Sequence, residues 1–254
     1  MINIYVKNAI LNVPLLSNVY ATIRQEYIKC RLYQRCALLR KFGPEVIRKV
    51  HSTLERSSLP YFANGGTLLG VVREHDFIRH DDDIDYNVLA PHKNAAEYCR
   101  ALLGVDGFSF KRAFEINGRI KQLVFSYKGI DVDFFFMHKE GGVLYNQLYD
   151  RFQDVQYKSS SEWSTIRYVF PPISGTKEVP FAGGKICIPV NAEEVLTAVY
   201  GCWKTPIRNF GGPQWEQDFG QARRVILPEK ALVVGLDRVW ELASNASENQ
   251  KLWY

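Results

Sequence analysis

The chain has 254 residues, 46% of them hydrophobic, so it can bury a substantial core within one domain. Its five cysteines are scattered and include no Cys-x-x-Cys pair, which argues against a disulfide framework and against a structural zinc site. No run of about 18 apolar residues is present and the first residues do not resemble a secretory signal, so we expect a cytoplasmic protein without membrane-spanning segments.

Positive charge is concentrated in residues 1–41. The net charge of the whole chain is +5, and this segment holds seven lysine and arginine residues against a single acidic residue, Glu26. Apolar residues recur at roughly helical spacing from Val19 to Leu39, so we predict a basic amphipathic helix as an N-terminal extension. Two interpretations stay open: the helix packs its apolar side on the protein body, or it makes a peripheral contact with an anionic membrane.

Residues 42–254 are expected to form a single domain, because no linker-like stretch, repeat or low-complexity tract divides them. A second helix should begin at Gly43-Pro44, since proline is favoured in the first turn of a helix. The elements expected next are a strand at 61–63, a glycine turn at 64–66 and a helix at 67–72.

Four aspartates then crowd into residues 81–85. Polar and apolar residues alternate from here to position 88, which predicts a strand with Asp83 and Asp85 on one face. Such a cluster needs cations, because its carboxylates repel one another. An exposed acidic loop is the alternative, but an apolar strand follows directly. A calcium EF-hand is excluded because its sixth and twelfth positions would be Tyr86 and His92.

A second pair of aspartates lies in the apolar segment 130–136, after a helix expected at 95–103 and a hairpin turn at Lys128-Gly129. Asp131 and Asp133 share one face of this predicted strand, where they need a compensating charge. Asp83 and Asp85 with Asp133, or with Asp131 beside it, would form a site for magnesium or manganese. A strand at 186–189 and helices at 192–200 and 230–242 complete the expected elements.

Phosphoryl transfer is the reaction that most needs clustered carboxylates and metal ions. Gly65 and Gly66 would let backbone N–H groups approach a phosphate closely, although the turn is neither a Walker A loop nor a dinucleotide fingerprint. Arg73 and Lys121 are favoured as further phosphate contacts because they precede the acidic strands. An ordinary surface ion pair is the alternative for each.

The stretch 64–88, with Gly-Gly-Thr-Leu-Leu-Gly, an arginine and Asp-Asp-Asp-Ile-Asp, resembles the LicD family. This family includes bacterial phosphocholine transferases and fukutin-related ribitol-phosphate transferases. The segment 129–136 is similar to a later family strand that ends in an aspartate, and residues 188–206 resemble its closing motif. Arg79-His80 departs from the family pattern, in which Pro-Trp is usual.

The resemblance implies an α/β fold, with an α+β mixed sheet flanked by helices in a nucleotidyltransferase-like catalytic domain over 42–254. It implies that Asp83 and Asp85 are the metal-binding pair and that Asp133 is the third catalytic carboxylate. The phosphate-contacting turn would consist of Gly65, Gly66 and Thr67.

We therefore hypothesise a transferase that uses Mg²⁺ or Mn²⁺ to move phosphocholine, glycerol phosphate or ribitol phosphate from a CDP-activated donor to a hydroxyl of a cell-surface glycan, releasing CMP. Asp133 would complete the metal site and help to deprotonate the acceptor. The reaction would take place at the inner face of the cell membrane, and no nucleic-acid partner is expected. The alternatives are a nucleotidyltransferase that adds NMP to a small molecule or sugar phosphate, and a non-catalytic subunit of a polysaccharide-assembly complex.

Overall fold

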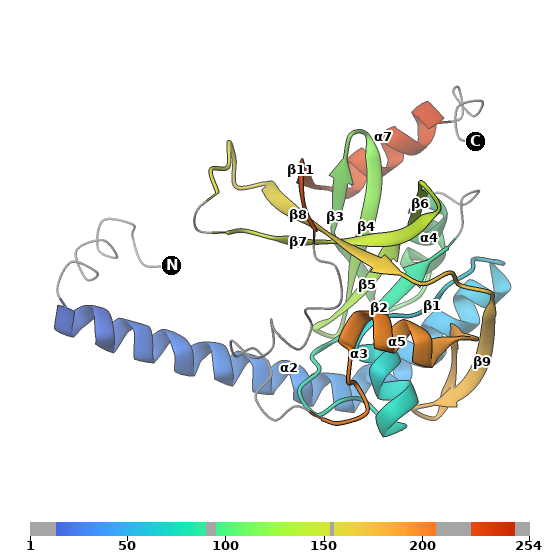
Figure 1. Cartoon of the computed structure of the whole chain (residues 1–254), viewed down its shortest axis with the longest axis horizontal. Coiled ribbons are helices and arrows are strands. Elements are labelled where there is room, and N and C mark those ends of the chain that lie inside the picture. The colour runs from blue at the N-terminus through green and yellow to red at the C-terminus, as the bar shows by residue number, and fades with distance from the viewer. Residues whose placement is uncertain (1–13, 90–94, 153–154, 207–224, 247–254) are drawn as a thin grey trace.

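The computed structural model describes residues 14–89, 95–152, 155–206 and 225–246 (Figure 1). Its main feature is a curled nine-stranded sheet with the strand order β1-β2-β5-β4-β3-β11-β8-β7-β6. Strands β2 and β5 pair in parallel, and the neighbouring pairs β1–β2 and β4–β5 are antiparallel. The predicted α/β class with a mixed sheet is therefore confirmed, and the nucleotidyltransferase-like core stays a prediction.

The elements have the following bounds. The sheet consists of β1 (Phe62–Ala63), β2 (Asp83–Val88), β3 (Phe108–Ile116), β4 (Arg119–Tyr127), β5 (Ile130–Phe136), β6 (His138–Glu140), β7 (Val143–Asp150), β8 (Glu162–Phe170) and β11 (Val225–Val234). A separate hairpin contains β9 (Thr176–Phe181) and β10 (Gly184–Pro189). The helical elements are α2 (Pro14–Arg56), α3 (Gly65–Leu69), the π-helical turn η1 (Gly70–Glu74), α4 (Ala95–Leu103), α5 (Ala192–Tyr200) and α7 (Leu236–Ala246).

Helix α2 is a single helix of 43 residues, with Pro44 inside it. The prediction of two helices that meet at residues 41–43 was therefore wrong. A proline inside a helix costs about 3 kcal/mol, because it removes one backbone hydrogen bond and its ring crowds the preceding turn. Burial offsets this cost, since Leu39 and Val46, on either side of the proline, are both completely buried in the core.

The first half of α2 projects beyond the protein body, as Figure 1 shows. Val19, Ile23 and Tyr27 are exposed and share one side of the helix, whereas Ile28 and Leu32 are exposed on the opposite side. The exposed apolar side chains thus surround the helix instead of forming one stripe, so the amphipathic pattern is not seen in this half. Within the described residues, none of the helices is long and apolar enough to cross a membrane.

The parallel register of β2 and β5 places two acidic strands side by side. Asp83 lies opposite Asp131, and Asp85 lies opposite Asp133. The alternate residues of both strands, such as Ile84 and Phe134, are completely buried in the core against the helices. One face of these strands therefore builds the core, and the other face carries the carboxylates.

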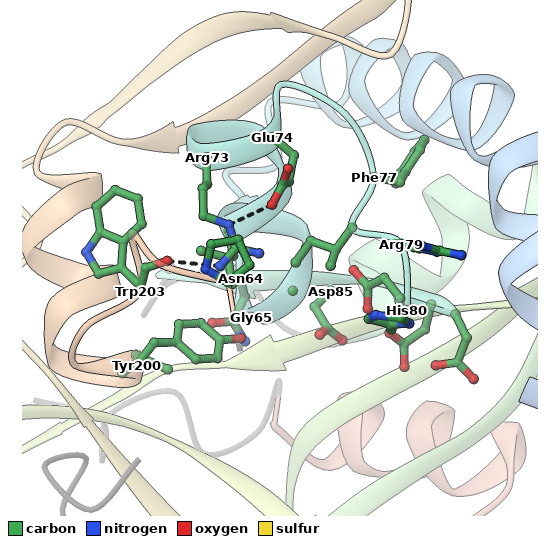
Figure 2. Close-up of a pocket in the computed structure, with 18 of the residues that line it drawn as sticks. Asn64, Gly65, Arg73, Glu74, Phe77, Arg79, His80, Asp85, Tyr200 and Trp203 are labelled. Atoms are coloured by element: carbon green, nitrogen blue, oxygen red, sulfur yellow. Dashed lines mark hydrogen bonds and ion pairs between the residues drawn. The ribbon is translucent and has the colours of Figure 1, made fainter. Parts of the chain in front are cut away.

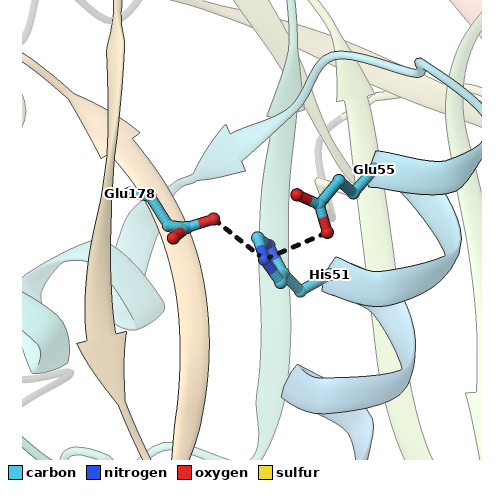
Figure 3. Close-up of side chains that lie close together, drawn as sticks. All are labelled: His51, Glu55 and Glu178. Carbon is cyan, nitrogen blue, oxygen red and sulfur yellow. Dashed lines mark ion pairs between the residues drawn. The ribbon is translucent and has the colours of Figure 1, made fainter.

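The second half of α2 is fastened to the β9–β10 hairpin by a small polar cluster (Figure 3). His51 Nε2 lies 3.0 Å from Glu178 Oε2 and 3.9 Å from Glu55 Oε2. On the other side of the ring, Nδ1 is 2.8 Å from the Tyr61 hydroxyl. Lys185 contacts the second oxygen of Glu178 at 2.5 Å. The cluster joins helix, hairpin and the chain entering β1 into one unit.

Most of the expected elements are confirmed, including the helices at 95–103 and 192–200 and the strands at 130–136 and 186–189. The helix expected at 230–242 is an exception, because β11 continues to residue 234 and α7 begins at residue 236. The end of β11 pairs with both β3 and β8, and its Ala231 is completely buried. Pairing on both sides of this strand outweighs the helical pattern of the local sequence.

Candidate functional site

Asp83 and Asp85 of β2 and Asp133 of β5 converge on the acidic face of the sheet. Each offers one carboxylate oxygen, and these three oxygens all lie within 4.8 Å of one another. The predicted convergence of these three side chains is confirmed. Such a group of oxygen ligands could hold a magnesium or manganese ion.

Two neighbouring aspartates are already neutralised by cationic side chains. Arg35 of α2 contacts Asp82 Oδ2 at 2.8 Å and Asp131 Oδ2 at 3.6 Å. Lys111 of β3 donates to both oxygens of Asp131 at 2.6 Å. Asp131 was the alternative third ligand in the sequence analysis, and these ion pairs favour Asp133 in that role.

The three converging carboxylates lack such compensation: within the described residues, none of them forms an ion pair with a cationic side chain. Burial, together with nearby Asp82, raises the pKa of Asp83 to about 6. Burial and the Asp83 charge raise the pKa of Asp133 to about 8, and burial followed by the charges of Asp83 and Asp133 raises the pKa of Asp85. The cluster is short of positive charge, which is the property expected of a divalent-cation site.

Gln122 of β4 orients the innermost carboxylate. Its side-chain amide donates a hydrogen bond to Asp133 Oδ1. Both side chains are buried, and Val124 of the same strand lies opposite Asp133 in the sheet. Gln122 thus holds one oxygen of Asp133 through its side chain.

The glycine turn makes room for the aspartates. A β-carbon on Gly65 would lie 2.7 Å from Asp85 Oδ2, and one on Gly66 would lie 2.6 Å from Asp81 Oδ2. Gly65 also has a φ of +53°, a conformation that side chains disfavour. A side chain at either position would therefore displace a carboxylate, which favours glycine for a reason that is independent of phosphate binding.

Thr67 positions Asp85 through the backbone. The buried Thr67 hydroxyl accepts a hydrogen bond of 3.0 Å from the Asp85 backbone N–H. The Asp85 carbonyl accepts another of 3.0 Å from the Asn64 backbone N–H. A cavity lies beside these residues, and Thr67 is not among the described residues that line it. The geometry therefore supports a positioning role for Thr67 and not the predicted phosphate contact.

A cavity of about 1360 Å³ opens beside the acidic strand. Figure 2 shows Tyr200 and Trp203 on one side of it and Arg79 and His80 on the other, with Gly65 and Asp85 between them. Further aromatic side chains in its lining are Phe135, Tyr168 and Phe170. The cavity therefore combines a carboxylate wall, a glycine turn and apolar walls, which is a composition suited to a phosphorylated ligand with an organic part.

Arg73 lines this cavity, but its guanidinium has protein partners. It donates to the Trp203 carbonyl at 2.9 Å and to Glu74 Oε1 at 2.7 Å. The contact with Trp203 connects η1 to the segment after α5, which belongs to the closing motif noted in the sequence. Arg73 therefore anchors this segment at the edge of the site.

Lys121 lies away from the aspartates. It is not among the cavity-lining residues in the part of the chain that the structure describes. Lys121 is buried with its Nζ 3.1 Å from His138 Nε2, and burial lowers its pKa to about 8. The structure thus does not support the predicted phosphate contact of Lys121.

Three residues that sequence reasoning missed support the acidic cluster: Arg35, Lys111 and Gln122. Arg35 was assigned to the basic helix and its solvent or lipid face, and only the fold brings it to Asp82. A polar Gln122 beside the apolar run 123–125 was an available signal that this strand has a polar site on one face.

Comparison with known proteins agrees with this geometry. Residues 58–191 match the sequence model of a family described as "LicD/FKTN/FKRP, nucleotidyltransferase domain", which is more than half of the chain. The chain belongs to the LicD family. The match begins just before β1 and ends after β10, so this LicD domain includes all three converging aspartates.

Two relatives carry the printed name "Ribitol-5-phosphate transferase FKTN", one from Macaca fascicularis and one from Homo sapiens. Each is 24% identical over 191 residues, which cover 73% of this chain and 38% of the relative. The chain therefore spans well under half the length of these relatives. The family and the relatives support the prediction of a phosphotransferase.

Proposed function

We propose that this LicD-family chain is a metal-dependent transferase that moves a phosphorylated alcohol from a CDP-activated donor to a hydroxyl of a glycan and releases CMP. The observation that carries the proposal is a group of three converging carboxylates, none of which forms an ion pair within the described residues and two of which line a large cavity. Its relatives named as ribitol-5-phosphate transferases favour ribitol phosphate among the candidate groups.

Asp83, Asp85 and Asp133 would hold the magnesium or manganese ion. When bound, such an ion neutralises charge on the phosphates and orients the transferred group. Asp83 and Asp85 line the cavity, whereas Asp133 lies behind them and is 6% exposed. This placement favours a ligand role for Asp133 over the additional role in deprotonating the acceptor that the sequence suggested.

Arg79 is the cationic side chain that we propose for contact with the donor's phosphates. It is exposed, lines the cavity directly before the acidic strand, and lies across the cavity from Trp203 (Figure 2). Arg40 of α2 donates a hydrogen bond of 2.8 Å to the Arg79 carbonyl and fixes the backbone there. Arginine suits this task because its guanidinium pairs with phosphate oxygens in a bidentate manner.

The test is an incubation of the purified chain with CDP-ribitol, CDP-glycerol or CDP-choline, a glycan acceptor and Mg²⁺, followed by measurement of CMP and of acceptor mass. We expect CMP release that Asp83→Asn and Asp85→Asn abolish and that Asp237→Asn, a change on α7, leaves intact. Pyrophosphate release from a nucleoside triphosphate would favour the nucleotidyltransferase alternative. Unchanged CMP release in both cluster variants would refute the assigned metal ligands.

A further inference from the structure

Two buried asparagines contact each other near the C-terminal end of the acidic strand β2. Asn146 Nδ2 of β7 donates a hydrogen bond of 2.9 Å to Asn87 Oδ1 of β2. Asn146 is 2% exposed and Asn87 is 0% exposed. Among the described residues, Asn146 Oδ1 and Asn87 Nδ2 have no hydrogen-bond partner. A buried polar atom without a partner costs about 1–3 kcal/mol, so the pair is costly unless a bound water or a ligand uses it.

The pair adjoins the cavity that Asp83 and Asp85 line, and one of its two members contributes to the lining. Asn146 lines it, and Asn87 lies two residues beyond Asp85 on the same face of β2, roughly 7 Å along the strand. A ligand with its phosphates at the aspartates would place its organic part here.

Aromatic side chains flank both amides. In the sheet register, Phe135 lies opposite Asn87 and Tyr168 lies opposite Asn146. Both aromatic residues line the cavity, as does Phe170 at the end of β8. Flat apolar surfaces next to an unpartnered amide suit a planar ring whose edge carries hydrogen-bonding groups.

We propose that the Asn87–Asn146 pair and these aromatic side chains form a subsite that selects a nucleobase with an exocyclic amino group, the cytosine of the donor nucleotide. The inference rests on the proposed function, which supplies a cytidine nucleotide. Asn146 Oδ1 accepts a hydrogen bond from the amino group. Uracil presents a carbonyl oxygen at the same place, so two acceptors would face each other. Asn87 is a positioning residue, because its hydrogen bond fixes the orientation of the Asn146 amide.

The experiment is calorimetric titration of the full chain with CMP and with UMP in the presence of Mg²⁺. We expect the wild-type protein to bind CMP about tenfold more tightly, the effect of one hydrogen bond gained against one acceptor left unpaired. Asn146→Ala should remove this preference. Asn87→Ala should reduce the preference for CMP over UMP, because the Asn146 amide loses the hydrogen bond that fixes its orientation.

The matched control is Asn191→Ala. Asn191 also has a buried side-chain oxygen without a partner among the described residues, but it donates to the Pro172 carbonyl and is not among the residues that line the cavity there. This variant should keep the wild-type preference for CMP. Thermal unfolding of each variant shows whether it is folded. If Asn146→Ala does not fold, the comparison of CMP with UMP binding by the wild-type protein still tests the proposed base selectivity.

Equal binding of CMP and UMP by the wild-type protein would overturn the subsite, and so would a preference that a folded Asn146→Ala variant retains. If CMP is released from a CDP-alcohol in the assay above while CMP and UMP bind equally, the subsite fails and the proposed function stands. If neither transfer nor CMP binding is found, both fail. A change in acceptor KM alone in Asn146→Ala would show that the pair contacts the acceptor sugar, and this also overturns the proposal.

Discussion

The α-carbon of Gly65 lies so close to the side chain of Asp85 that a β-carbon at this position would come within 2.7 Å of Asp85 Oδ2. The same relationship joins Gly66 to Asp81 at 2.6 Å. The glycine turn and the acidic segment therefore fit closely against each other, although Gly65 and Asp85 are 20 positions apart in the sequence and Gly66 and Asp81 are 15 apart. The occurrence of the glycine turn together with the acidic segment therefore has a steric cause in addition to any contact of the turn with a ligand.

Substitution of Gly65 by alanine should harm the metal site more than the fold. The φ of +53° costs about 1–2 kcal/mol for alanine, and the new methyl group must displace the Asp85 carboxylate. We expect the Mg²⁺-induced rise in melting temperature to be lost. The control is Gly118→Ala, since Gly118 has a φ of +77° and has no atom within 4 Å of an added β-carbon in the described structure. Equal loss of the Mg²⁺ effect in both variants would contradict this explanation.

The stability of the metal-free protein should fall as the pH rises. The folded-state pKa of Asp83 is raised from 3.8 to about 6 and that of Asp133 from 3.8 to about 8, so the folded protein binds more protons than the unfolded chain between these values. The stabilising contribution is complete below about pH 4 and is lost by about pH 8, at ~1.4 kcal/mol per pKa unit. Urea unfolding in a chelator from pH 5 to pH 8 measures this slope, and added Mg²⁺ should flatten it.

Asp133→Asn should stabilise the metal-free protein at pH 8 while it removes the response to Mg²⁺. The asparagine has the same shape and can still accept the hydrogen bond from Gln122, but it does not carry a buried charge. Thermal unfolding with and without Mg²⁺ measures both effects, with Asp237→Asn as the control. A lower melting temperature for Asp133→Asn in a chelator would show that the carboxylate is compensated by something else.

Arg35→Met should destabilise the protein by about 1–2 kcal/mol, because Asp82 loses its ion pair with Arg35 and Asp131 loses one of its two cationic partners among the described residues. Both side chains of the Arg35–Asp82 pair are partly exposed, so the effect should be smaller than for a fully buried pair. A double-mutant cycle with Asp82→Asn measures the coupling. Additive effects of the two changes would mean that the contact contributes nothing to stability.

Removal of the projecting half of α2 tests the membrane interpretation. A chain that begins after residue 33 keeps Arg35 and the buried Leu39, so its melting temperature should be close to that of the full chain. If lipid contact occurs, flotation with anionic liposomes should require residues 1–33. Equal flotation of both forms removes the interpretation. Deletion of residues 1–41 is a poorer test, because it also removes Leu39 and unfolding could be mistaken for lost binding.

Two-residue alternation predicted which aspartates share a face of each strand, and the resemblance to the LicD family selected Asp133 over Asp131 as the third converging carboxylate. The sequence was insufficient for Lys121, since proximity along the chain does not tell which face a residue takes at the start of a strand. The ion pairs of Asp131 were also out of reach, because Arg35 and Lys111 come from distant elements. Pro44 misled the helix prediction, since burial on both sides of it could not be seen locally.

Helix α2 has one further consequence, because it is continuous from Pro14 to Arg56. Its first turn lies about 30 Å from Arg35, at 1.5 Å per residue, and the same rigid rod carries His51 in the hairpin cluster. A protein or surface that binds the projecting end of the helix would therefore produce a large displacement from a small change in helix angle. A tilt of the helix would draw the Arg35 guanidinium toward or away from Asp82, and so alter the electric field at the carboxylates. It would also move Leu32 and Arg40, which line the cavity from the same helix.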